Sequence, residues 1–230
     1  MLKAGVDAFN AASLTDEQVA AYAKQGVKWM DDNNPVAPPS DPYAKRLANI
    51  VKDHQEIDGL KINYKIYKVL DVNAFACADG GVRVFAGLMD IMDDDELLAI
   101  MGHEIGYVIN HDTCDGMKSA LNRSALRNMA ASQSGGVGQT ARSEIGGFAN
   151  SMVGASFNRK QESEADEFSY NYLKEKNYNA LAPATSFEKL EKLSEGKPSN
   201  GMDKLMSSHP DSAKRAKRVR DQAKKDGLMK

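Results

Sequence analysis

His103 and Glu104 are adjacent polar residues in a run that is otherwise strongly apolar, and both side chains can do chemistry. An imidazole binds metals or transfers protons near neutral pH, and a carboxylate can act as a base. Residues 93–112 have the pattern of one buried helix, because acidic residues fill the first turn and apolar residues follow. Burying an imidazole and a carboxylate is costly without a partner or a metal. We therefore expect side chains from elsewhere in the chain to reach this pair.

The spacing after His103 matches part of a zinc-binding motif. In H-E-x-x-H, two histidines one helical turn apart hold the metal, and the glutamate lies beside the first. Here Tyr107 stands at the position of the second histidine. A single histidine on an apolar helix is more often a core residue, but the His-Glu pair followed by Ile105 and Gly106 favours a metal site. Because Gly106 has no side chain, we expect another element to pack closely against it.

Glu162 and Asp166 are the acidic residues best suited to complete such a site. They lie four residues apart in a stretch with a helical pattern, so they share one face. An acidic face exposed to solvent is the simple alternative. Together with the His-Glu pair, they fit better as a third zinc ligand, Glu162, and a supporting acid, Asp166, that orients a histidine.

The chain has four histidines, and their positions limit which of them can share a metal. His54 is predicted to lie on the surface of an early helix. His111 follows His103 by eight residues, about 80° around the helix and two turns away, so it is not expected to reach the same ion. His209 is therefore the histidine left free to approach from a distant segment.

Composition limits the broad class of protein. The chain has 230 residues, enough for a full core in one domain, and its net charge of -2 gives no field that would attract nucleic acid. No apolar run reaches eighteen residues, so no membrane span is expected. A signal-peptide pattern is also missing, so the protein is cytosolic or a leader precedes this sequence. Cys77 and Cys114 could form one disulfide or act as small buried apolar residues.

The first half of the chain predicts two helices and then a small sheet. One helix is capped by Thr15 and runs to about residue 31, and the next is opened by Pro42 and runs to about residue 57. Alternating β-branched and aromatic residues then predict an antiparallel sheet with a hairpin turn at 78–81. Its strands are expected at residues 61–70, 73–77 and 82–85, with a link at 87–90. The fold class is therefore α+β, mainly helical, with the sheet preceding the helix at 93–112.

Beyond residue 112 the chain is predicted to be helical almost to its end. Helices are expected at residues 115–133, 139–155, 158–176 and 184–193. Residues 197–215 are predicted to form a long loop leading into a last, basic helix, which could face anionic lipid or, more simply, solvent. We divide the chain into an N-terminal arm with the first helix, residues 1–40, and a single larger domain, residues 41–230.

Six segments together resemble the Ste/Oma-type zinc metallopeptidases, over nearly the whole chain after about residue 40. They are DPYAKRL, INYKIYKVLDVNAFACADGGVRVFAGLMD, GHEIGYVINHD, QESEADEFSY, ATSFEKLEKL and HPDSAKR. Matched in this order the segments are highly specific, although each alone would be a weak signal. The resemblance implies a gluzincin-like metallopeptidase fold, in which a mixed sheet and the active-site helix form one side of a cleft.

The same resemblance implies a site that holds one Zn²⁺ ion. Its implied parts are the metal ligands His103 and Glu162, the catalytic residues Glu104 and His209, the supporting residues Asp166 and Arg215, and Tyr107 at the position of the second histidine ligand. In an intact site of this kind, zinc would activate a water and Glu104 would take its proton.

Tyr107 is where the sequence departs from the family. A phenol has a reference pKa of about 10 and must lose its proton to bind zinc well. Even changes outside the ligand shell cost roughly 10–100-fold in affinity or activity, and losing a ligand should cost at least that. We therefore predict a weakly metallated and strongly impaired enzyme. Zinc could still bind through His103, Glu162 and His209, with Tyr107 as a phenolate.

Two functions from different classes follow. The first is a zinc metalloendopeptidase that hydrolyses misfolded or unfolded envelope proteins, disabled here by Tyr107. The alternative is a pseudo-protease that binds unfolded chains or an envelope partner without cutting them. The resemblance places either one in the periplasm as an outer-membrane lipoprotein, attached only through a lipid anchor outside this sequence. In a third, structural interpretation the His-Glu pair is only a core feature, and Glu162 would lie far from His103.

Overall fold

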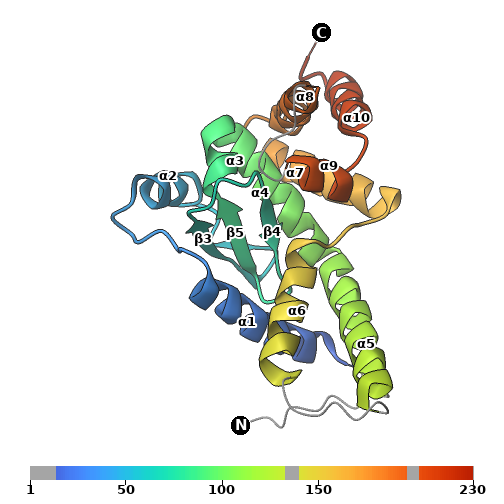
Figure 1. Cartoon of the computed structure of the whole chain (residues 1–230). Helices are drawn as coiled ribbons and strands as arrows, with labels where there is room; N and C mark the ends of the chain where they lie inside the picture. The colour runs from blue at the N-terminus through green and yellow to red at the C-terminus, as the bar shows by residue number, and fades with distance from the viewer. Residues whose placement is uncertain (1–13, 133–139, 196–201, 230) are drawn as a thin grey trace.

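The computed structural model describes residues 14–132, 140–195 and 202–229. Within these ranges a small sheet lies in the middle of the molecule with helices around it (Figure 1). The helices are α1 (Asp16–Asn33), α2 (Pro42–Ile50), α3 (Ala86–Ile91), α4 (Asp94–Ile109), α5 (Asp112–Ser132), α6 (Thr140–Val153), α7 (Arg159–Glu175), α8 (Ala182–Ser194), α9 (Met202–Ser208) and α10 (Ser212–Lys225). The strands are β1 (Glu56–Ile57), β2 (Leu60–Lys61), β3 (Asn63–Tyr67), β4 (Ala74–Ala76) and β5 (Gly81–Phe85). The prediction of a mainly helical fold with a small sheet before the helix at 93–112 is confirmed.

The three-stranded sheet is mixed, so the prediction of an antiparallel sheet is wrong in part. Its order is β3-β5-β4, with β5 parallel to β3 and antiparallel to β4. The expected hairpin at 78–81 does join β4 to β5, and the chain also reverses between β3 and β4. Two reversals leave β3 and β5 running in the same direction. In the order β3-β5-β4, β4 lies at an edge of the sheet, and it contacts α4.

α4 begins where the acidic run predicted. The Asp93 carboxylate accepts a hydrogen bond from the Glu96 N–H, and the Glu96 side chain accepts one from the Asp93 N–H, which is a capping box. The helix is buried along most of its length, as its apolar pattern predicted. A Cβ atom at Gly106 would lie 3.0 Å from the Cα atom of Ala165 in α7. The expected close approach at Gly106 is therefore confirmed, and α7 is the element that makes it.

One predicted helix is too long, and two short helices were not predicted. α2 ends at Ile50 rather than near residue 57, because a tight turn at Asp58 and Gly59, both with positive φ, pairs β1 with β2. Residues 86–91 form the short helix α3 rather than a simple link. The predicted loop at 197–215 contains α9, whose Met202 and Leu205 lie three residues apart and are buried in the core.

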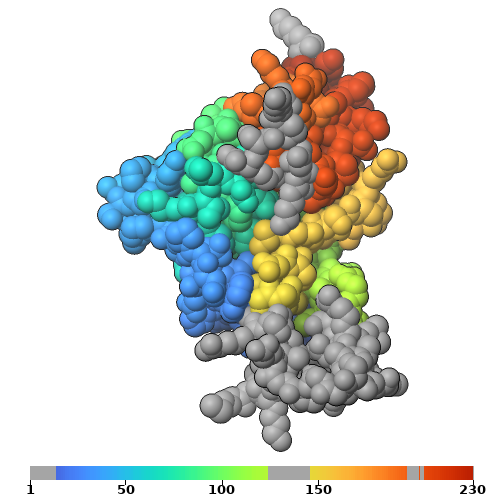
Figure 2. Space-filling model, viewed as in Figure 1, coloured from blue at the N-terminus to red at the C-terminus, as the bar shows by residue number. Residues whose placement is uncertain are grey.

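α1 packs against α5 and α6, at the end of the molecule opposite α8 and α10 (Figure 1). On the face shown in Figure 2, the yellow segment around and after α6 lies between the blue N-terminal region and the red C-terminal helices. A second hydrophobic core, separate from the one that holds Met202 and Leu205, lies where α1 packs against α5 and α6. Cys77 and Cys114 belong to it and are buried free thiols, which favours their interpretation as small apolar residues over a disulfide. The division of the chain at residue 40 stays a prediction. None of the helices in the described part of the chain is long and apolar enough to cross a membrane.

Candidate metal centre

Four helices bring the predicted site residues together from segments far apart in the sequence. α4 carries His103, Glu104 and Tyr107, and α7 crosses it at Gly106 and carries the two acids. α9 ends just before His209, and α10 contributes a guanidinium. The residues placed in this one cluster are His103, Glu104, Tyr107, Glu162, Asp166, His209 and Arg215, and all are buried except His209, which is partly buried. The distance between Glu162 and His103 that would have supported the structural interpretation is not found, because Nε2 of His103 lies 3.8 Å from Oε2 of Glu162.

Three side chains in the cluster offer atoms that could bind a metal. His103, Glu162 and His209 each present one candidate ligand atom, and these atoms lie within 4.8 Å of one another. Nδ1 of His209 lies 3.3 Å from Oε1 of Glu162. Burial opposes ionisation of Glu162, but His209 and Arg215 hold the pKa of its carboxyl below the ordinary value. The carboxylate is therefore charged and directed at the two imidazoles.

The Tyr107 hydroxyl lies between these three groups. It donates a hydrogen bond to Oε1 of Glu162 at 2.5 Å, and its oxygen lies 2.9 Å from Nε2 of His103 and 3.4 Å from Nδ1 of His209. Its ring stacks on Phe157 with the centroids 3.7 Å apart, so the hydroxyl is held in place. Burial and the nearby Glu162 and Glu104 charges raise the pKa of Tyr107 well above its ordinary value.

Arg215 supplies a permanent positive charge that contacts both acids of the cluster. Its guanidinium lies 2.6 Å from Oε2 of Glu162 and 2.6 Å from Oδ1 of Asp166, and it packs over the ring of Phe187. Oδ1 of Asp166 also lies 3.0 Å from Nδ1 of His103, the contact expected of an acid that orients a histidine. Burial opposes ionisation of Asp166, but His103 and Arg215 lower its pKa to about 2.

Glu104 lies in the wall of a cavity beside the cluster. Its carboxylate is buried, and burial raises its pKa despite His209, whose Nε2 lies 3.8 Å from Oε1. It lines a cavity of about 480 Å³ together with the β4 edge, α5, α6, Tyr107 and His209. A second, small apolar cavity also touches Glu104 and His103 and is lined mainly by α4 and α8. An extended chain in the larger cavity would therefore meet both Glu104 and the edge of the sheet.

These residues fit a zinc ion in type but not in their arrangement. Two imidazoles and a carboxylate are donors that zinc uses in catalytic sites. However, the Tyr107 hydroxyl contacts all three of them and keeps its proton, which a metal ligand would have to lose. A metal bound by His103, Glu162 and His209 would have to displace this hydroxyl or its proton. The phenolate ligand expected from the sequence is therefore disfavoured by its surroundings, and the metal-binding roles stay predictions.

The two remaining histidines lie outside the cluster. The prediction that His54 lies on the surface is wrong: it is 1% exposed, and its Nδ1 lies 2.6 Å from the Tyr172 hydroxyl. Its burial follows from the early end of α2, which lets the chain turn inward. His111 lies at the corner between α4 and α5 and contacts Asp16, away from His103 as expected. Phe157, which stacks on Tyr107, was not predicted, since no pattern marks a single aromatic residue between two helices.

Comparison with known proteins gives independent evidence of the family to which the chain is related. Residues 42–223 match peptidase family M48. Metalloprotease LoiP of Escherichia coli is 42% identical over 229 residues, which cover 99% of this chain and 89% of that protein. Metalloprotease YcaL of the same organism is 40% identical over 221 residues, 96% of this chain and 85% of that protein. The mitochondrial metalloendopeptidase OMA1 of Arabidopsis thaliana is 27% identical over 148 residues, 64% of this chain and 28% of that protein.

Proposed function

This chain belongs to peptidase family M48, as its resemblance to zinc metallopeptidases predicted, and from that premise we propose that it is an endopeptidase scaffold whose metal centre is closed by Tyr107. Its substrates would be misfolded or unfolded envelope proteins. The chain would work in the periplasm, attached to the outer membrane by a lipid anchor outside this sequence. The observation that supports the closed centre is the Tyr107 hydroxyl within 3.4 Å of His103, Glu162 and His209.

Glu104 is the residue best placed for proton transfer in peptide hydrolysis. It lines the larger cavity, and its raised pKa brings the carboxyl closer to the range in which a general base works near neutral pH. His209 lines the same cavity and would position or stabilise a substrate carbonyl. The free edge of β4 offers N–H and C=O groups that could pair with an extended peptide of almost any sequence. Glu104, His209 and the β4 edge would therefore be in place for hydrolysis once the centre beside them could hold a metal.

The experiment compares the parent chain with Tyr107→His. Histidine at this position removes the hydroxyl and supplies the second imidazole of H-E-x-x-H. We expect the parent to bind little zinc and to hydrolyse casein slowly, and Tyr107→His to bind one equivalent and gain activity. Zinc content is measured by atomic emission and hydrolysis by release of dye from labelled casein. A parent chain that already holds one tightly bound zinc with full activity would refute the proposal.

The double variant Tyr107→His/Glu104→Gln is the matched control. Glu104 is not among the three candidate metal donors, so the double variant should keep the zinc of Tyr107→His. It should lose the gained hydrolysis, because glutamine cannot take up a proton. Activity that survives in the double variant would come from a contaminating protease.

The second candidate function is a pseudo-protease that binds unfolded chains without cutting them. The observation that favours it is the open cavity of about 480 Å³ beside a closed centre. In this case the parent should bind unfolded casein, measured by fluorescence anisotropy, and Tyr107→His should gain zinc but no turnover. Recovery of turnover from this single change would instead support the first candidate.

A further inference from the structure

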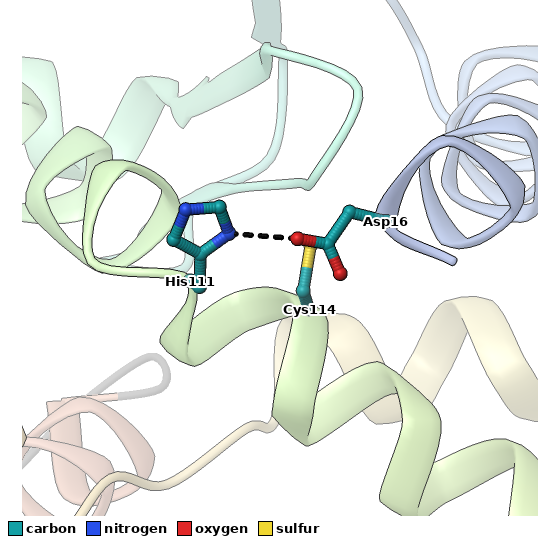
Figure 3. Close-up of side chains that lie close together, drawn as sticks. All are labelled: Asp16, His111 and Cys114. Atoms are coloured by element: carbon teal, nitrogen blue, oxygen red, sulfur yellow. Dashed lines mark ion pairs between the residues drawn. The ribbon is translucent and has the colours of Figure 1, made fainter. Parts of the chain in front are cut away.

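A second group of metal-binding side chains lies at the corner between α4 and α5, separate from the His103 cluster. Asp16 comes from the first turn of α1, His111 from the corner itself and Cys114 from the first turn of α5 (Figure 3). The three side chains each offer one ligand atom, a carboxylate oxygen, an imidazole nitrogen and a sulfur, and these atoms lie within 4.8 Å of one another. Oxygen, nitrogen and sulfur together are the donors of zinc-class metal ions.

The backbone at the corner directs the imidazole toward α1. His111 has a φ of 64°, in the left-handed region that few residues other than glycine adopt. This conformation separates α4 from α5 and turns the side chain away from the buried face of α4. Nδ1 of His111 then lies 2.9 Å from Oδ2 of Asp16 (Figure 3). This contact joins two segments that are almost a hundred residues apart in the sequence.

Cys114 completes the group one helical turn after His111. It is a free cysteine that is only 5% exposed, whereas Asp16 is partly exposed and His111 is exposed. Figure 3 shows its sulfur beside the Asp16 carboxylate, on the side where α1 meets α5. Burial and the charge of Asp16 raise the pKa of this thiol, so an ion that binds it must release the thiol proton to solvent. The sulfur is the soft donor on the buried side of the group, and the carboxylate and imidazole lie on the side nearer to solvent.

Lys118 holds the carboxylate in the orientation that the group requires. Its ammonium lies 2.9 Å from Oδ1 of Asp16 and leaves Oδ2 directed at His111. Partners that orient a ligand in this way are a general feature of metal sites. The lysine also reduces the negative charge of the group, which favours an ion that gains affinity from sulfur and nitrogen over calcium or magnesium.

We propose that Asp16, His111 and Cys114 bind one zinc-class divalent ion, with the fourth position open to solvent. The ion would fasten the start of α1 to the corner between α4 and α5. It would therefore stabilise the packing of the N-terminal helix, and it would take no part in hydrolysis. This site is independent of the proposed function, because it shares no side chain with the His103 cluster.

Cobalt(II) added to the full chain tests the proposal directly, since only a thiolate ligand gives an intense sulfur-to-cobalt absorption band in the near ultraviolet. The chain has two cysteines, and no side chain of the His103 cluster contains sulfur, so the band reports on a cysteine site alone. We expect one equivalent of cobalt to produce the band in the parent and in Cys77→Ala, and none in Cys114→Ala. Zinc should displace the cobalt and raise the midpoint of thermal unfolding of the parent but not of Cys114→Ala.

His111→Asn keeps the test valid if the cysteine variant fails to fold. Asparagine tolerates the left-handed conformation, and position 111 is exposed, so the fold should be kept. The variant should weaken cobalt binding by at least the roughly 10–100-fold that lesser changes at metal sites cost. Asp115→Asn, on the same turn of α5 but outside the group, is the control and should bind like the parent. A parent without the band, or His111→Asn with parental affinity, would overturn the proposal.

Discussion

Tyr107→Phe removes a single oxygen from the centre of the cluster and leaves the ring stacked on Phe157. Without metal, the loss is the hydrogen bond from the hydroxyl to the charged carboxylate of Glu162. A hydrogen bond to a charged group contributes about 1.5–3 kcal/mol to stability. For a chain of this size, 1 kcal/mol corresponds to roughly 2–4 °C in the unfolding midpoint. The variant should therefore unfold roughly 3–12 °C lower than the parent in the presence of a chelator.

The affinity of the same variant for zinc should change in the opposite direction. Any ion bound by His103, Glu162 and His209 must first break the hydrogen bond that the parent makes. Removing that cost, with one factor of ten for each 1.36 kcal/mol, strengthens zinc binding by roughly 10- to 150-fold. The variant nevertheless lacks a second H-E-x-x-H imidazole, so it should bind zinc more weakly than Tyr107→His.

Thermal unfolding followed by circular dichroism measures the first quantity, and competition with a chromophoric chelator measures the second. Tyr22→Phe, a half-buried tyrosine on α1, is the control and should stay within about 0.5 kcal/mol of the parent. If zinc binding weakens in Tyr107→Phe, the tyrosine is itself a ligand and the closed-centre argument fails. If neither quantity moves, the hydroxyl does not lie between the three donors in solution.

Two further predictions concern the scaffold. Gly106→Ala should destabilise the fold by about 1–3 kcal/mol through overpacking, because the new Cβ would lie 3.0 Å from the Cα atom of Ala165. Gly116→Ala on α5, with open space around its Cβ, should instead stabilise the fold by about 0.5–1 kcal/mol. Chemical denaturation measures both free energies of unfolding, and equal effects would contradict the packing argument. Asp31→Asn should cost about 3–5 kcal/mol at pH 7, because it leaves the buried Arg83 guanidinium without its carboxylate. Burial opposes ionisation of Asp31, but Arg83 lowers the pKa of its carboxyl. The stabilisation of the folded state by this ion pair is therefore present above the unfolded pKa of about 3.9 and is lost as pH falls through the folded pKa. The loss of stability in Asp31→Asn should shrink at acid pH, and a loss that stays constant with pH would refute the assignment.

The two helices that carry most of the candidate site, α4 and α7, were predicted well from the sequence. The acidic run at residues 93–96 and the apolar pattern after it marked α4 within a few residues. The pair of Glu162 and Asp166 was placed on the correct helix, since a spacing of four residues on a strong helical pattern allows few alternatives. These features are local, so a single stretch of sequence contains the information that determines them.

Non-local features were harder to predict. The parallel pairing of β3 with β5 depends on two chain reversals, and alternation along one strand does not specify which neighbour it joins. His54 was placed on the surface because the pattern of α2 appeared to continue past Ile50, whereas the turn at Asp58 brings it against Tyr172. The contact of His111 with Asp16 similarly depends on the left-handed backbone of His111, a conformation that is uncommon outside glycine and that no sequence pattern marked.

The cluster around Tyr107 can remain folded without a metal, because other groups balance its charges. Glu162 and Asp166 are buried carboxylates that would be costly without a counter-charge. Arg215 contacts both, and the Tyr107 hydroxyl donates to Glu162 from the other side. A histidine at position 107 would remove that donated hydrogen bond and leave the space between the donors open to a cation. In the closed centre that we propose, the tyrosine would therefore lower both the need for a metal and the capacity to bind one, and a single side chain would separate the fold of this chain from the activity of its family.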